Sequence, residues 1–124
     1  MSRPLRPHEI AKRDQALAAA RAKAAEPGQV AIVEDDAPDG TRCSMCDCPP
    51  VNSDPASHDD ANCPGCPDPA AVTIIVFATP QETSASVCAG HLGRARQILT
   101  DALHRATPNV GITDHPESQW RDPA

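Results

Sequence analysis

The strongest hydrophobic pattern in the chain lies at residues 71–78 and predicts a β-strand. Its sequence, Ala-Val-Thr-Ile-Ile-Val-Phe-Ala, is apolar or β-branched at successive positions, so both faces of the extended chain are suited to burial. The turn-like sequence Thr79-Pro80-Gln81-Glu82 follows, and residues 83–88 have the composition of a second strand. The pattern therefore predicts a β-hairpin.

From residue 89 onward, the spacing of apolar residues changes to that of a helix. Apolar side chains recur every three or four residues, and charged side chains occupy the opposite side. Thr107-Pro108 ends the pattern, because a residue that precedes proline avoids helical angles. We expect a helix over 89–106 that faces the hairpin through Leu92, Ala95, Ile98, Leu99, Ala102, Leu103 and Ala106.

The N-terminal region predicts a second helix. Residues 8–25 are rich in Ala, Arg and Lys, which favour helices, and Glu26-Pro27-Gly28 ends the run. The apolar stripe is weak, so we expect a solvated surface helix, with docking to a partner as the alternative. Residues 29–33 predict a short edge strand that leads into an acidic loop.

Two further segments lack hydrophobic periodicity. Residues 47–62 are rich in Pro, Asp and Ser, which is typical of a loop that cannot pack a core. Residues 110–124 are polar and contain proline and the single Trp120, and we expect a flexible tail.

The composition indicates a thin hydrophobic core that needs a cross-link. The 124 residues include one Phe, one Trp and no Tyr, and domains below roughly 70–80 residues usually require a disulfide or a metal ion. The N-terminus lacks the apolar run of a secretory signal, and no stretch has the length of a membrane span. We therefore expect a cytoplasmic protein whose six cysteines stay reduced and bind metal.

Cysteine and histidine spacing predicts a zinc site. Cys63-Pro-Gly-Cys66 and Cys88-Ala-Gly-His91 form two short-spaced ligand pairs on either side of the hairpin. Each pair can close a tight turn, and two such turns can meet across one tetrahedral zinc ion. Such a closed site is structural, and its binding energy adds directly to folding.

A second cluster, Cys43-Ser-Met-Cys46-Asp-Cys48, supports several arrangements. It predicts a second zinc site with His58 as the fourth ligand. Alternatively, Cys43 and Cys46 join the Cys63 and Cys66 pair, which leaves the Cys88 and His91 pair for Cys48 and His58. Cys43 and Cys46 could also replace the Cys63 and Cys66 pair, or a thiol could stay free, with Cys48 as the first candidate. An iron–sulfur cluster would leave His91 without a role.

The order of ligand pair, hairpin and helix over residues 63–106 resembles the treble-clef zinc fingers. The chain is also similar to small Cys-x2-Cys…Cys-x2-His proteins of actinobacteria and their phages. The resemblance implies an α+β, treble-clef-like zinc domain. Together with the elements expected from the residues, it divides the chain into an N-terminal helix and linker at 1–28, a zinc-binding domain at 29–106 and a flexible tail at 107–124. Treble clefs serve many tasks, so the resemblance implies an architecture and not an activity.

Charge and motifs restrict the function. The net charge is −6, and residues 27–70 hold nine of the 17 acidic side chains but one of the 11 basic ones, which disfavours nucleic-acid binding by that part. No phosphate-binding loop or paired-carboxylate motif occurs, so no small-molecule substrate is expected. We expect a zinc-stabilised protein-protein interaction module without catalytic activity.

Two other functions are alternatives. The first is nucleic-acid binding through the Arg-bearing helix 89–106, together with the basic residues of the N-terminal segment. The second is a catalytic zinc on Cys43, Cys46 and His58, with Asp59 or Asp60 as a base. We expect the remaining histidines to be solvated, and Asp114-His115 to lie in the tail where nothing positions it for catalysis; they are His8, His104 and His115.

Overall fold

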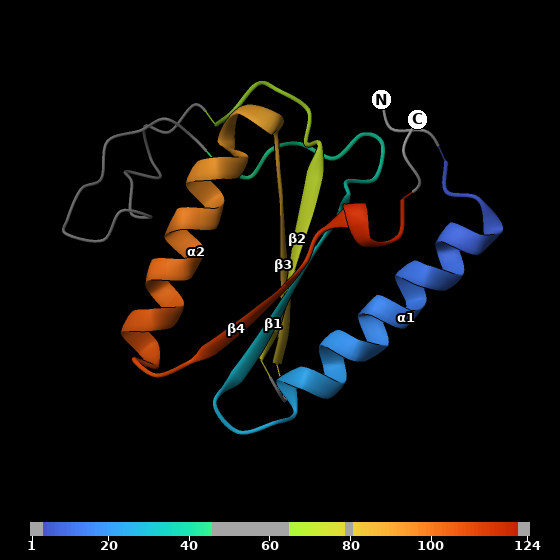
Figure 1. The fold of residues 1–124 in the computed structure, drawn as a ribbon. Coiled ribbons are helices and arrows are strands. Elements are labelled where there is room, and N and C mark those ends of the chain that lie inside the picture. Colours follow the sequence, from blue (N-terminus) through green and yellow to red (C-terminus); the bar gives the residue numbers. More distant parts are fainter. Residues whose placement is uncertain (1–3, 46–64, 79–80, 122–124) are drawn as a thin grey trace.

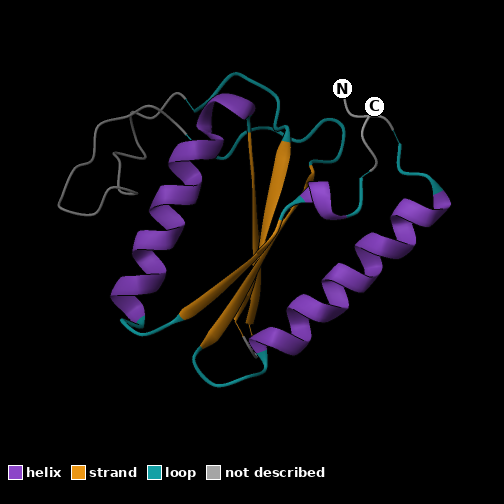
Figure 2. Cartoon of the chain, in the orientation of Figure 1, coloured by secondary structure: helices purple, strands orange, loops and turns teal. Residues whose placement is uncertain are grey.

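A computed structural model describes residues 4–45, 65–78 and 81–121 (Figure 1). These residues form an α+β fold with a helix on each side of one sheet (Figure 2). In chain order the elements are α1 (Pro7–Ala24), β1 (Gln29–Asp36), β2 (Val72–Ala78), β3 (Gln81–Val87), the 3-10 turn η2 (Ala89–His91), α2 (Leu92–Ala106), β4 (Gly111–His115) and the 3-10 turn η3 (Glu117–Gln119). Among the described residues, no helix combines the length and apolar character that crossing a bilayer requires.

The sheet has four strands in the order β3-β2-β1-β4. β2 pairs antiparallel with both β3 and β1, whereas β1 pairs parallel with β4. The predicted hairpin at β2 and β3 and the predicted helix at α2 are confirmed. The hairpin is part of a four-stranded sheet, whereas the expected arrangement of ligand pair, hairpin and helix contained only the two strands of the hairpin.

Strand β1 lies in the centre of the fold, so the prediction of an edge strand was wrong. Its side chains alternate between the two faces: Val30 and Ile32 pack in the cluster beneath α2, and Ala31 and Val33 pack in the cluster beneath α1. The strand also runs beyond residue 33 through the acidic residues to Asp36. Its neighbour β4 is distant in sequence, so local pattern gave no sign of pairing on that side.

Helix α1 is confirmed, and it packs on the sheet instead of being solvated on all sides. Ala20 and Ala24 are buried against β1 and Phe77 of β2, because small side chains let the helix backbone approach the sheet closely. At the other end, the buried Glu9 carboxylate accepts a hydrogen bond of 2.9 Å from the backbone N–H of Arg6 and so caps the helix. Gly28, with a φ of 72°, then turns the chain into β1.

Residues 111–121 of the C-terminal segment are folded, so the prediction of a flexible tail was wrong for these residues. Residues 111–115 form β4, and Trp120, which is 1% exposed, packs in the cluster with Phe77 on the α1 face. A large aromatic side chain gains most from burial, and it holds η3 against the fold. The sequence signal is weak because the strand has only five residues and three of them, Thr113, Asp114 and His115, are polar.

Candidate metal centre

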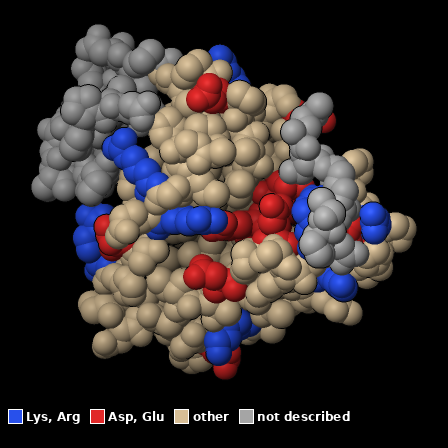
Figure 3. All heavy atoms as spheres, turned by 45° about the horizontal axis from the view of Figure 1, so that its top comes forward, with Lys and Arg blue, Asp and Glu red and all other residues tan. Residues whose placement is uncertain are grey.

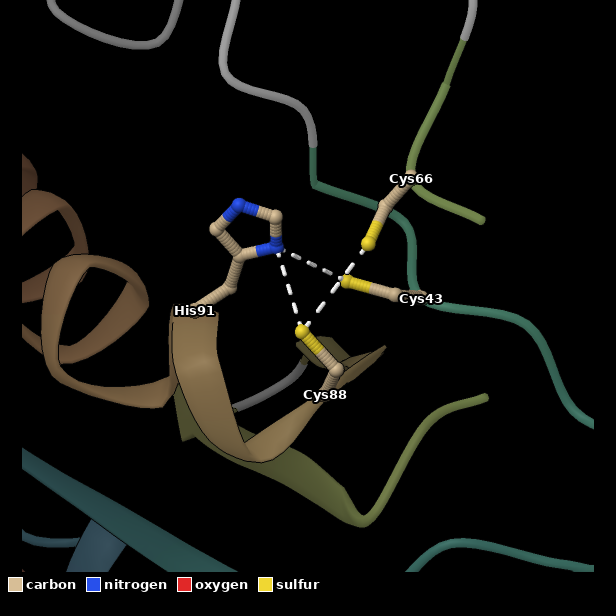
Figure 4. Close-up of side chains that lie close together, drawn as sticks. All are labelled: Cys43, Cys66, Cys88 and His91. Atoms are coloured by element: carbon tan, nitrogen blue, oxygen red, sulfur yellow. Dashed lines mark hydrogen bonds between the residues drawn. The ribbon is translucent and has the colours of Figure 1, made fainter. Parts of the chain in front are cut away.

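Four potential metal ligands converge at one end of the sheet (Figure 4). The ligand atoms of Cys43, Cys66, Cys88 and His91 all lie within 4.8 Å of one another, and the four residues are buried. Cys43 follows β1, Cys66 precedes β2, Cys88 follows β3, and His91 ends η2 at the start of α2. These four residues, called the Cys3His centre below, could hold one metal ion.

The antiparallel pairing of β2 with β1 and β3 explains why three separate segments meet there. The carboxyl ends of β1 and β3 lie beside the amino end of β2, as the pairs Asp36–Val72 and Val72–Val87 show. Beyond the strands, backbone hydrogen bonds continue this pairing toward the cysteines. They are Ala37 N–H to Ala71 O (3.1 Å), Ala71 N–H to Val87 O (2.8 Å), Ala70 N–H to Thr41 O (2.9 Å), Cys43 N–H to Asp68 O (3.4 Å) and Ser44 N–H to Ser86 O (2.9 Å).

The distances within the centre suit ligands arranged around a common point. The Nδ1 atom of His91 lies 3.3 Å from Sγ of Cys88 and 3.4 Å from Sγ of Cys43, and the sulfurs of Cys66 and Cys88 are 3.9 Å apart. Gly65, with a φ of 75°, makes the turn directly before Cys66. Gly90, the other glycine beside a ligand, does not have a positive φ.

In the absence of a metal, the thiols of Cys43 and Cys66 differ in pKa. Burial raises the pKa of Cys43, but hydrogen bonds with the Cys88 and Met45 backbones and with the His91 and Cys88 side chains lower the pKa to about 7. A backbone hydrogen bond from Asp68 lowers the pKa of Cys66, whereas burial and the neighbouring sulfurs of Cys43 and Cys88 raise it to about 11. Cys43 therefore loses its proton more readily than Cys66, whose thiolate would need a cation to offset the neighbouring sulfurs, so metal binding would release protons.

The centre contains some of the predicted ligands but in a different combination. Cys66, Cys88 and His91 are together as predicted, and Cys43, which was expected in the second cluster, completes the group. Four of the predicted ligands lie outside the described residues: Cys46, Cys48, His58 and Cys63. Within the described ranges, no other group of His, Cys, Asp or Glu side chains is spaced to hold a metal ion, so no second site is evident.

A sequence signal for Cys43 exists, but it becomes visible only with the strand pairing. Cys43 lies seven residues after the end of β1, and Cys66 lies six residues before the start of β2. In an antiparallel pair, positions equally far beyond the paired ends lie near each other. The short spacing between Cys63 and Cys66 favoured a local pair instead, because β1 was not expected to pair with β2.

The other residues that the sequence analysis singled out lie outside the Cys3His centre. His104 lies on the exposed side of α2, whereas His115 ends β4, and its Nδ1 lies 3.1 Å from Oε1 of Gln119. Asp114, also in β4, is therefore held by the sheet and not in a tail. Arg96 of α2 donates two hydrogen bonds to Glu34 of β1, at 2.8 and 2.5 Å.

Acidic and basic side chains are interspersed on the face shown in Figure 3. Lys and Arg do not gather there into one continuous patch, and ion pairs such as Arg96–Glu34 and Arg13–Asp35 neutralise part of the basic charge.

Comparison of the chain with protein-family models, curated proteins and solved structures found no match. The functional interpretation therefore rests on the Cys3His centre and on the surface around it.

Proposed function

We propose that the Cys3His centre binds one structural Zn²⁺ ion. Zinc–sulfur bonds of about 2.3 Å and zinc–nitrogen bonds of about 2.0 Å place tetrahedral ligand atoms about 3.5–3.8 Å apart. The observed separations of 3.3, 3.4 and 3.9 Å are close to these values. Three sulfurs and one imidazole also favour zinc over magnesium or calcium, which prefer oxygen ligands.

The single observation that supports a non-catalytic role is that all four ligands are buried, with 5–8% of each residue exposed. A catalytic zinc keeps one position open for water or substrate, whereas four protein ligands complete the tetrahedron. The β2–β3 hairpin and the helix α2, which begins directly after His91, also support the treble-clef-like interpretation of this part of the chain.

The proposed activity is protein binding in an apolar groove next to the centre. The groove has a volume of about 290 Å³ and lies between α2 and the β2–β3 hairpin. All of its lining side chains are uncharged, and they include Val76, Ala85, Ile98 and Ala102. Because β3 is the outermost strand of the described sheet, an extended partner segment with apolar side chains could pair with β3 and fill the groove.

The metal centre would shape this groove. Ser44 and Met45, which line the groove, follow Cys43, and the lining residue Val87 precedes Cys88. An ion that fixes Cys43 and Cys88 therefore also fixes one wall of the groove. Partner binding is expected to depend on the metal for this reason.

The alternative, nucleic-acid binding through the Arg-bearing helix 89–106, has less support. Arg96 is paired with Glu34, and Arg105 donates a hydrogen bond to the backbone oxygen of Asp101. Because the Glu34 carboxylate neutralises Arg96, the helix offers less free positive charge to phosphates.

Site-specific photo-crosslinking tests the groove. A photoreactive amino acid at Ala85 of β3 is expected to form a discrete crosslinked product with a protein in cells that naturally make this chain. The same residue at Ala18, on the exposed side of α1, is the matched control. The proposal fails if the crosslinks at Ala85 are absent or equal those at Ala18, or if Cys88→Ser leaves them unchanged.

A further inference from the structure

A second cavity, distinct from the Cys3His centre and from the apolar groove, lies between α2 and the carboxyl-terminal halves of β1 and β4. Its volume is about 220 Å³. Ile32, Ile74 and Leu99 provide an apolar floor, and Glu34, Arg96 and Asp114 provide charged groups. The cavity is therefore neither a purely apolar gap nor a purely charged surface.

The topology accounts for its position. β1 and β4 are parallel neighbours, and the chain leaves their carboxyl ends toward opposite faces of the sheet. After β1 it continues to Cys43, in the cluster on the α2 face, and after β4 it continues to Trp120, in the cluster on the α1 face. In α/β sheets, a crevice for ligands forms where the connections of adjacent parallel strands diverge in this way.

The register places the acidic groups on the cavity side. Asp114 pairs with Ile32, and Glu34 pairs with Ile74, so these four side chains share the face of the sheet that α2 covers. Arg96 reaches down from α2 and engages both oxygens of Glu34. This two-point pair neutralises the Glu34 carboxylate and fixes the Arg96 side chain.

Asp114 then determines the charge that the cavity prefers. With Glu34 and Arg96 paired, the three groups carry a formal net charge of −1, and the Asp114 carboxylate is exposed at the rim. An anionic ligand would face the carboxylates of Glu34 and Asp114. It could form a two-point ion pair with Arg96 only if the pair between Arg96 and Glu34 were broken. Because the Glu34 side chain is only 15% exposed, loss of its partner would leave a largely buried charge uncompensated.

We propose that this cavity binds a small organic cation, in which an ammonium group contacts Asp114 and a short apolar body covers Ile32, Ile74 and Leu99. This site shares Ile74 and Leu99 with the apolar groove, but its charged groups lie outside that groove and outside the Cys3His centre. It adds a small-molecule ligand to a chain whose sequence contains no recognisable substrate motif.

Titration of the metal-loaded, full-length protein with cyclohexylammonium tests the proposal. Backbone amide NMR signals of Glu34, Arg96 and Asp114 are expected to shift and to saturate. Cyclohexanol and cyclohexanecarboxylate share the apolar body but are neutral and anionic, and both are expected to bind more weakly. Asp114→Asn is expected to weaken cyclohexylammonium binding about five-fold, which is what loss of a partly exposed charge pair costs.

Asp14→Asn, which changes an exposed carboxylate on α1, is the control and should leave the affinity unchanged. Equal or tighter binding of cyclohexanecarboxylate would overturn the proposal, as would the absence of saturable shifts at the three residues. The ligand series uses the unaltered protein, so it decides the question even if Asp114→Asn disturbs folding.

Discussion

At the scale of single residues, Cys43 is the position where the observed and the expected ligand sets differ. The sequence-based quartet used Cys63 with Cys66, Cys88 and His91, whereas the described structure has Cys43 beside the last three. The difference matters because only one of these cysteines can be the fourth ligand of a tetrahedral ion.

Cys43→Ser and His91→Ala should each bind one metal ion fewer per chain than the unaltered protein, because each removes one of the four ligands. Metal content per chain after purification under reducing conditions, together with the visible absorption of the Co²⁺-loaded protein, provides the measurement. His104→Ala, on the exposed side of α2, should keep the full metal content. Retention of the full content by Cys43→Ser would show that this cysteine is not a ligand.

Glu117 at the start of η3 predicts a pH dependence. Burial first, and then a hydrogen bond with the Asp36 carboxyl, raise the pKa of Glu117, and Arg121 only partly opposes them. A raised folded-state pKa favours folding below the unfolded-state pKa, and this contribution is lost as pH rises through the folded-state pKa. At neutral pH the charged Glu117 therefore disfavours folding.

Glu117→Gln should consequently increase the free energy of unfolding at pH 7, and the gain should shrink as the pH falls toward 4.5. Urea unfolding at several pH values measures it. Glu82→Gln, in a weak surface ion pair of 3.8 Å with Arg21, should have little effect at any of these values. A Glu117→Gln protein that is less stable than the original at pH 7 would show that the pair with Arg121 dominates.

At the scale of elements, β4 and η3 show what local patterns cannot reveal. The hairpin and α2 are evident from the sequence because their apolar residues are dense and periodic. β4 gains its stability from parallel pairing with β1, whose partner residues are about 80 positions away. α1 packs through Ala20 and Ala24, and alanine favours a helix without indicating burial.

Trp120→Ala should lower the free energy of unfolding by about 3–5 kcal/mol, the usual cost of removing a buried aromatic side chain. The reason is its 1% exposure within the cluster that joins α1 to β1 and β2. Ile10→Ala, at a residue that is 39% exposed, should cost much less. Denaturant unfolding measures both, and equal small effects would restore the interpretation of this segment as a tail.

At the scale of the whole molecule, the sheet separates two sources of stability. One apolar cluster, with Trp120, Phe77 and Val33, lies on the α1 face and does not include the Cys3His centre. The other contains Cys43, Cys66 and Cys88 together with the apolar residues of α2. The expectation that metal holds the chain together more than apolar packing therefore applies best to the α2 face.

The sequence predicted the α+β class, two helices, the hairpin and three members of the Cys3His centre, because short spacing and periodicity are local properties. It did not predict the central position of β1, the pairing of β4 or the place of Cys43. Each of these depends on contacts between distant segments, which no single window of residues contains.

The central claim is that an ion at the Cys3His centre stabilises the α2 side of the fold. Thermal unfolding of the reduced, full-length protein before and after verified metal removal by a chelator tests it most directly. We predict a lower melting temperature after chelation and recovery on addition of Zn²⁺, because binding to the folded state adds to stability. An unchanged melting temperature in the metal-free protein would contradict the account.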